Sequence, residues 1–233
     1  MISPLHESTL LSIGPVPISG SMLTSVGITL VLGIGSLIIG RSFRPEPGKL
    51  QAILEVIVTT ILEQIEEVTR KDGRPYLPLI GTLFLFLLVA NSLPLLPGLL
   101  PPTERLVTVM ALGLVVFVSV YFFGMRRHGL WQYLKHFFQP TPLLFPIHVL
   151  SELTRTFSLM MRLFGNNMSH GLILGVIVSV AGLLVPIPII LFGLLTGVVQ
   201  AYIFTILATV YIAAAVEDHP KAQGHDSKES VRP

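Results

Sequence analysis

The chain has 233 residues, of which 52% are hydrophobic and only 12% charged, and its formal net charge at pH 7 is +2. Soluble domains carry about 25% charged residues, so this composition excludes an ordinary soluble domain and indicates an integral membrane protein. Cysteine is absent, which excludes disulfides, thiolate metal sites and cysteine nucleophiles. The apolar runs reach about 20 residues, the length of a helix crossing a hydrocarbon core of about 30 Å, whereas barrel strands alternate over about 10. We therefore predict an all-α polytopic membrane protein with a single membrane domain, residues 1–233.

The first apolar run follows a short lead-in. Residues 1–20 contain three prolines and one acid, Glu7, which predicts an irregular segment. No basic stretch precedes the apolar run, so we expect no removable signal peptide. Residues 21–40 are uncharged and long enough to span the membrane once. The cations that follow mark the cytoplasmic side, which places the N-terminus outside; they are Arg41, Arg44 and Lys49.

Residues 50–72 show a different pattern, with one apolar and one polar helical face. The apolar face comprises Leu50, Leu54, Ile57, Ile61, Ile65 and Val68. The polar face comprises Gln51, Glu55, Thr59, Glu63, Glu66 and Arg70. This pattern predicts an amphipathic helix in the membrane interface, ended by Gly73. A solvated helix that packs on a partner is a compatible alternative.

Residues 76–124 are predicted to form a helical hairpin. An uncharged run leads outward to Asn91 and a loop rich in proline and glycine, and a second apolar run from Leu106 to Met125 returns. Arg126 and Arg127 end the second helix on the inner side. Asn91 is interpreted either as a hydrogen-bonding group at a helix end or as a channel group.

Residues 147–216 are predicted to form two long helices. No clear helix breaker lies between residues 147 and 182, and a helix of that length measures about 54 Å, against a core of about 30 Å. It must tilt by more than about 50° unless the chain breaks at Gly165 and Asn166. The last helix, from about Pro188 to Val216, would measure about 43 Å and tilt as well. Residues 217–233 are expected to be a polar cytoplasmic tail.

The distribution of cations supports five crossings. Arg105, beside Glu104, is the only cation that this topology places outside. The cations that it places inside are Arg41, Arg44, Lys49, Arg70, Lys71, Arg74, Arg126, Arg127, Lys135 and those of the tail. The C-terminus is therefore predicted to be cytoplasmic.

A polar stripe crosses the most apolar part of the chain. No Asp, Glu, Lys or Arg occurs between Leu163 and Val216, and a cation such as Arg162 costs several kcal/mol in a membrane unless it meets water or a partner. Ser158, Arg162 and Asn166 recur every four residues, and His170 extends the stripe. Such groups line a hydrated path or a proton relay. The other polar groups of these two helices are His148, Glu152, Arg155, Thr196, Gln200, Tyr202, Thr205 and Thr209.

Motifs for enzyme chemistry are missing. The sequence has no His-Glu-x-x-His zinc motif, no phosphate-binding Gly-x4-Gly-Lys-Ser/Thr and no convincing nucleophile elbow. We therefore expect no catalytic residue, no metal site and no cofactor.

The segment Glu152-Leu-Thr-Arg-Thr-Phe-Ser158-Leu-Met-Met-Arg162-Leu-Phe-Gly-Asn166 resembles the signature of subunit a of F-type ATP synthases. The last helix, with Gln200 and Tyr211, and the ending Glu217-Asp-His219 are similar to that family too, as is the run from Val89 to Gly98. The resemblance covers roughly residues 75–219.

The resemblance implies a stator subunit that couples proton or sodium translocation to ATP synthesis or hydrolysis. Its two long tilted helices would border a rotating ring of c subunits, and two offset half-channels would carry the ion. The family's essential arginine aligns with Arg162, and the glutamine that faces it aligns with Gln200. The expected partners are the c-ring, the peripheral-stalk b subunits, other synthase subunits and lipid, with no nucleic acid. The expected location is the bacterial inner membrane.

The sequence departs from the family pattern at two positions. Many members carry an ionisable residue where this chain has Gly171, and some carry histidine where it has Gly193. We expect His170 to relay protons in the outer half-channel, with hydrogen bonding in the bundle as the alternative. His148 and Glu152 lie four residues apart and either line the inner half-channel or form an ordinary surface pair.

Two other functions are alternatives. A secondary transporter or permease is the main alternative, but the sequence lacks the internal repeat typical of that class. The second alternative is an intramembrane enzyme, but the sequence offers neither a nucleophile with its base nor a set of metal ligands.

Overall fold

The computed structural model describes residues 9–13, 16–41, 49–95, 101–128, 145–181 and 185–216. Two strands, β1 (Thr9–Ile13) and β2 (Val16–Ser19), pair antiparallel ahead of the first helix. The prediction of an irregular lead-in is therefore corrected: both strands contain β-branched residues, such as Ile13 and Val16, which favour strands. Everything else that is described is helix, turn or short loop, which confirms the all-α fold class.

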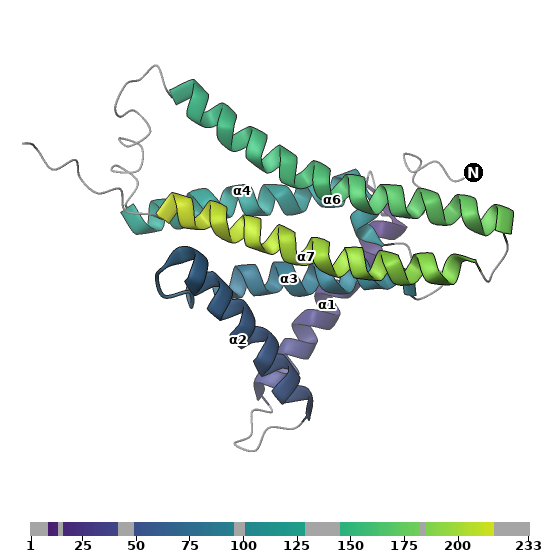
Figure 1. Ribbon diagram of the computed structural model, residues 1–233, viewed down its shortest axis with the longest axis horizontal. Coiled ribbons are helices and arrows are strands. Elements are labelled where there is room, and N and C mark those ends of the chain that lie inside the picture. The colour runs from purple at the N-terminus through teal and green to yellow at the C-terminus, as the bar shows by residue number, and fades with distance from the viewer. Residues whose placement is uncertain are drawn as a thin grey trace, which may run out of the picture.

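Five of the described helices are long and apolar enough to cross a membrane, in agreement with the prediction. The spanning helices are α1 (Gly20–Arg41), α3 (Leu77–Ser92), α4 (Leu106–His128), α6 (Phe145–Ala181) and α7 (Pro186–Val216). Figure 1 shows α3, α4 and α7 side by side along the long axis, with α6 crossing above them and α1 and α2 projecting below.

Helix α2 (Lys49–Thr69) is the amphipathic element. Ile61 and Ile65 are buried in the main core, where α2 packs on α3 and α7. The helix ends at Thr69, earlier than the predicted Gly73, because Arg70 takes a positive φ of 51° that no α-helix continues. Gly73 lies beyond the helix end, where the chain passes close to α2. A Cβ atom at Gly73 would lie 2.9 Å from Ile65 Cγ2, so this close approach needs a glycine.

The hairpin of α3 and α4 is closed by two short 3-10 helices, η1 (Leu93–Leu95) and η2 (Pro102–Glu104). Its buried side chains join those of α7 in one core. The largest fully buried members from α3, α4 and α7 are Ile80, Leu87, Val109, Val116, Phe204 and Ile212. The short helix η2 packs against α6, α4, α1 and α3.

The two C-terminal helices are long and uninterrupted within their bounds. Helix α6 has 37 residues and continues through Gly165 and Asn166, so the alternative of a break there is wrong. At 1.5 Å per residue it measures about 56 Å, and the 31 residues of α7 measure about 46 Å. Both exceed a hydrocarbon core of about 30 Å, so each must tilt in a membrane.

Candidate functional site

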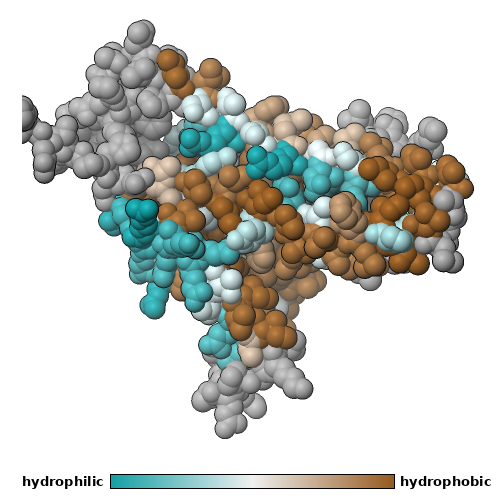
Figure 2. Space-filling model, in the orientation of Figure 1, coloured by the Kyte–Doolittle hydropathy of each residue, from teal (hydrophilic) through white to brown (hydrophobic). Residues whose placement is uncertain are grey.

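Arg162 lies on the outward face of α6. Its side chain is exposed, as is that of Ser158 one turn earlier. Leu159 and Leu163 are 2% and 0% exposed and face the core. The helical period therefore turns the core residues inward and leaves the guanidinium on the surface. Figure 2 shows a hydrophilic strip along α6 within a largely apolar surface.

A small cavity opens further along α6, where this helix meets α7, η2 and the end of α3. Its volume of about 30 Å³ is room for about two water molecules. Asn166 and His170 line it, so the structure brings these two predicted residues together. The polar residues that line it from other elements are Asn91, Thr103, Glu104 and Thr196.

A buried hydrogen-bond network braces this cavity. The Asn91 side chain donates from Nδ2 to the carbonyl oxygen of Gly197 at 2.9 Å. Its Oδ1 accepts from Thr103 Oγ1 at 2.9 Å and from Asn167 Nδ2 at 3.2 Å. The close approach requires Gly197, because a Cβ atom there would lie 2.9 Å from the Asn91 Cβ. One amide thus ties α3, η2, α6 and α7 together, which goes beyond hydrogen bonding at a helix end, one of the two roles predicted for Asn91.

Gln200 is buried on α7, with 7% of its surface exposed. Neither Gln200 nor Arg162 is among the described residues that line the cavity. The predicted set therefore divides into a cavity group, a buried amide on α7 and an exposed pair on α6.

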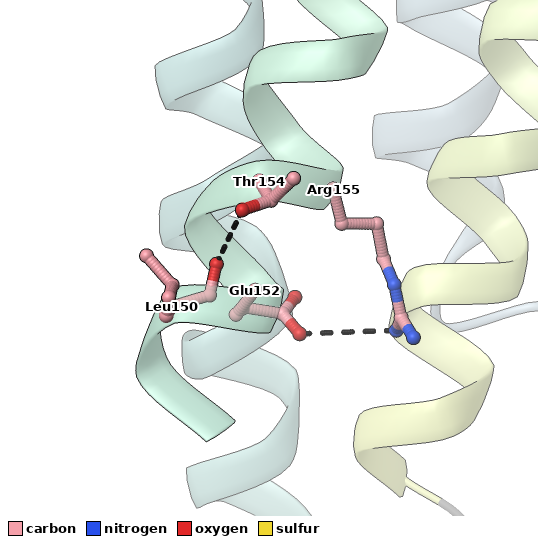
Figure 3. Close-up of polar contacts among 4 residues, drawn as sticks. All are labelled: Leu150, Glu152, Thr154 and Arg155. Atoms are coloured by element: carbon pink, nitrogen blue, oxygen red, sulfur yellow. Dashed lines mark hydrogen bonds and ion pairs between the residues drawn. The ribbon is translucent and has the colours of Figure 1, made fainter. Parts of the chain in front are cut away.

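The N-terminal part of α6 carries the other predicted pair. Glu152 Oε2 lies 3.8 Å from Arg155 Nη1, and Figure 3 shows the Arg155 side chain reaching from α6 toward α7. There its guanidinium carbon lies 5.2 Å from the centroid of the Tyr211 ring, within the range of a cation–π contact. His148 belongs to α6, but its side chain lies outside the described part of the chain. Arg155 is therefore the ion-pair partner of Glu152.

Three polar residues of the cavity received no role in the sequence analysis: Thr103, Glu104 and Asn167. Their sequence signal is weak, because each is a single polar residue near a loop or beside a residue already chosen. The clearest signal is Glu104, the only acid between Asp72 and Glu152. Within the described ranges, no group of three histidines or acids is placed to hold a metal ion.

Comparisons with known proteins agree with this architecture. Residues 21–213 match the family described as ATP synthase A chain. A relative named ATP synthase subunit a 2 from Bradyrhizobium sp. is 50% identical over 92% of this chain and 96% of its own length. ATP synthase subunit a from Albidiferax ferrireducens is 44% identical over 87% of this chain and 88% of its own length. ATP synthase subunit a 1 from Hahella chejuensis is 44% identical over 89% of this chain and 88% of its own length. The chain belongs to the ATP synthase A chain family.

Proposed function

We propose that this subunit a is the ion-translocating stator of its ATP synthase, and that Arg162 faces the rotating c-ring. Family membership makes the chain a multi-pass membrane protein that works with other ATP synthase subunits. The finer assignment depends on one observation, the exposed Arg162 on a helix whose neighbouring surface is apolar. Met161 and Phe157, exposed by 43% and 62%, are typical of that surface.

The physical argument concerns charge. A guanidinium at membrane depth needs an anionic or hydrated partner. A carboxylate on the ring is such a partner, because a nearby cation favours its ionised form. A ring carboxylate that passes Arg162 would therefore release its ion there, and the fixed cation would block direct leakage between the half-channels. In this proposal the chain moves ions and leaves ATP chemistry to other subunits.

The two half-channels are assigned to the two ends of α6. The cavity lined by Asn166 and His170 would belong to the outer one, and Glu152 with His148 to the inner one. Ser158 and Gln200 would provide polar groups near the arginine. The peripheral-stalk b subunits and lipid would contact the remaining surface. We propose a proton as the transported ion, with sodium as the alternative.

The proposed orientation puts the N-terminus outside and the C-terminus in the cytoplasm of a bacterial inner membrane. Five crossings require the two termini to lie on opposite sides. Tags at the N-terminus and at Pro101 should react with an impermeant reagent added outside intact cells, and tags at Gly129 and the C-terminus should not. External labelling of the C-terminus would contradict the orientation.

The test of function is ATP-driven ion pumping in membrane vesicles. Arg162→Ala should abolish pumping although the complex assembles. Arg162→Lys should fail as well, because a lysine lacks the planar fork of the guanidinium and loses its proton more easily when desolvated. Pumping that persists in either assembled variant would refute the role of Arg162 and would favour a transporter-like mechanism.

A further inference from the structure

The cavity between α6, α7 and η2 contains two ionisable side chains from different elements. Glu104 is the last residue of η2, and His170 lies in α6. Both are partly buried. The family function alone assigns no role to Glu104, which precedes the second helix of the hairpin.

The Glu104 carboxylate lies against Gly171. A Cβ atom added to Gly171 would lie 2.8 Å from Glu104 Oε1 and 3.1 Å from Oε2. Both oxygens therefore sit where a side chain of residue 171 would begin. Because Gly171 has no side chain, the Glu104 carboxylate from η2 can occupy the space beside it.

The imidazole of His170 lies against Gly193 in the same way. A Cβ atom added to Gly193 would overlap the ring. His170 Nε2 is 3.1 Å from the carbonyl oxygen of Ile189. Because a carbonyl only accepts, Nε2 must carry the proton in this contact, which leaves Nδ1 as the acceptor of the neutral ring.

The electrostatic surroundings of Glu104 are simple. The elements packed against η2 are α1, α3, α4 and α6. Among the described residues, the ionisable groups beside η2 are Arg105 and His170, and α3 has none. The others on the packed helices lie further away along them: Arg41 in α1, Tyr121, Arg126 and Arg127 in α4, and Glu152, Arg155 and Arg162 in α6. Burial raises the pKa of Glu104 from its ordinary value of 4.5 to about 7, and Arg105 opposes this shift. The carboxyl group can therefore exchange a proton near neutral pH.

We propose that Glu104 and His170 form the proton-exchanging pair of the outer half-channel, with Glu104 as the first acceptor. This proposal rests on the proposed function. The Glu104 carboxylate takes a proton from outside water and gives it, through water in the cavity, to Nδ1 of neutral His170. The imidazolium releases it toward the ring carboxylate near Arg162, about 12 Å further along α6. Both groups return to their starting state, so no other reactant is consumed.

The experiment measures the rate of proton transport driven by a proton gradient in assembled complexes, as a function of external pH. Glu104→Gln should lower the rate by about a hundredfold at neutral pH, the lower end of the usual range for a lost acid–base group. It should also remove the part of the pH profile that titrates near 7. Transport should remain coupled to ATP synthesis. Glu55→Gln, an exposed acid of α2, is the matched control and should leave rate and profile unchanged.

A relocation variant separates chemistry from structure. Truncation by Glu104→Ala vacates the space beside residue 171, so the double variant Glu104→Ala with Gly171→Glu should recover a pH-dependent rate that Glu104→Ala lacks. A wild-type rate and profile in assembled Glu104→Gln would overturn the proposal. So would a double variant that assembles but transports no faster than Glu104→Ala. Transport that follows sodium concentration at fixed pH would overturn it as well.

The test of the Glu104–His170 pair and the test of the stator function can fail independently. If Arg162→Ala abolishes pumping and Glu104→Gln changes nothing, only the pair is refuted. If Arg162→Ala still pumps, the stator proposal itself fails.

Discussion

The two halves of α6 hold their polar groups in different ways. Near its start, Glu152 and Arg155 lie on the same helix three residues apart, and the Arg155 side chain is 42% exposed. Just past its middle, Asn167 and His170 contact α3 and α7 beside a cavity. Figure 1 shows the corresponding difference in the backbone, because α6 diverges from α7 at its start and runs beside it further on.

This difference indicates which polar side chains are held in a fixed position by the packing of the helices. A pair on one exposed helix can change rotamer at little cost, and such pairs contribute about 0 to 1 kcal/mol. Groups held by several elements keep their positions, because moving one leaves buried partners without hydrogen bonds. We therefore expect the cavity end to be sensitive to substitution and the start of α6 to be tolerant.

The largest effect is expected for Asn91→Leu. The change removes the shared partner of Thr103, Asn167 and the Gly197 carbonyl. Each buried group left unpaired costs about 1 to 3 kcal/mol, so little subunit should assemble. The measurement is the amount of subunit in purified complexes. Ser92→Ala is the control, because its hydroxyl bonds to the Leu88 carbonyl of its own helix, and it should assemble normally.

The next effect concerns His170. His170→Ala should slow pumping without uncoupling it, because a proton carrier is lost while Arg162 remains. His170→Gln should stay slow too if the ion is a proton, since an amide fills the space but does not titrate. The pumping rate is measured against external pH. A wild-type rate and pH profile in both variants would refute the relay.

A smaller effect is expected in the pH dependence of stability. The folded pKa of Glu104, about 7, lies above its ordinary value of 4.5. Between these values the folded state binds more protons than the unfolded state, so stability falls as pH rises from about 4.5 to 7. The midpoint temperature of the purified complex should decrease over this range more in the wild type than in Glu104→Gln. Parallel curves would contradict the shift.

The smallest effect is expected for Glu152→Gln. Loss of an exposed ion pair should change stability by less than about 1 kcal/mol, and the midpoint temperature should hardly move. A modest loss of pumping rate with unchanged stability would support a place for Glu152 in the inner half-channel. A large loss of stability would contradict the tolerance expected for this end of α6.

The helices could be predicted because membrane crossing depends on run length and hydropathy, which are local properties. The cavity could not, because it combines Asn91, Glu104 and His170, which are far apart in sequence and meet only through helix packing. The stripe of Ser158, Arg162, Asn166 and His170 was visible from its spacing. Its division into an exposed half and a cavity half was not, since that depends on where α7 and η2 cover α6.

The central claim is that the face of α6 bearing Arg162 borders the c-ring. The chain contains no cysteine, so a single introduced thiol can be cross-linked without background. Ser158→Cys lies one turn from Arg162 on this exposed face, and Ser36→Cys in α1 is an exposed control. With a second cysteine beside the ring carboxylate, oxidation should join Ser158→Cys to the c subunit and leave Ser36→Cys unlinked. A ring disulfide from Ser36→Cys with none from Ser158→Cys would contradict the account.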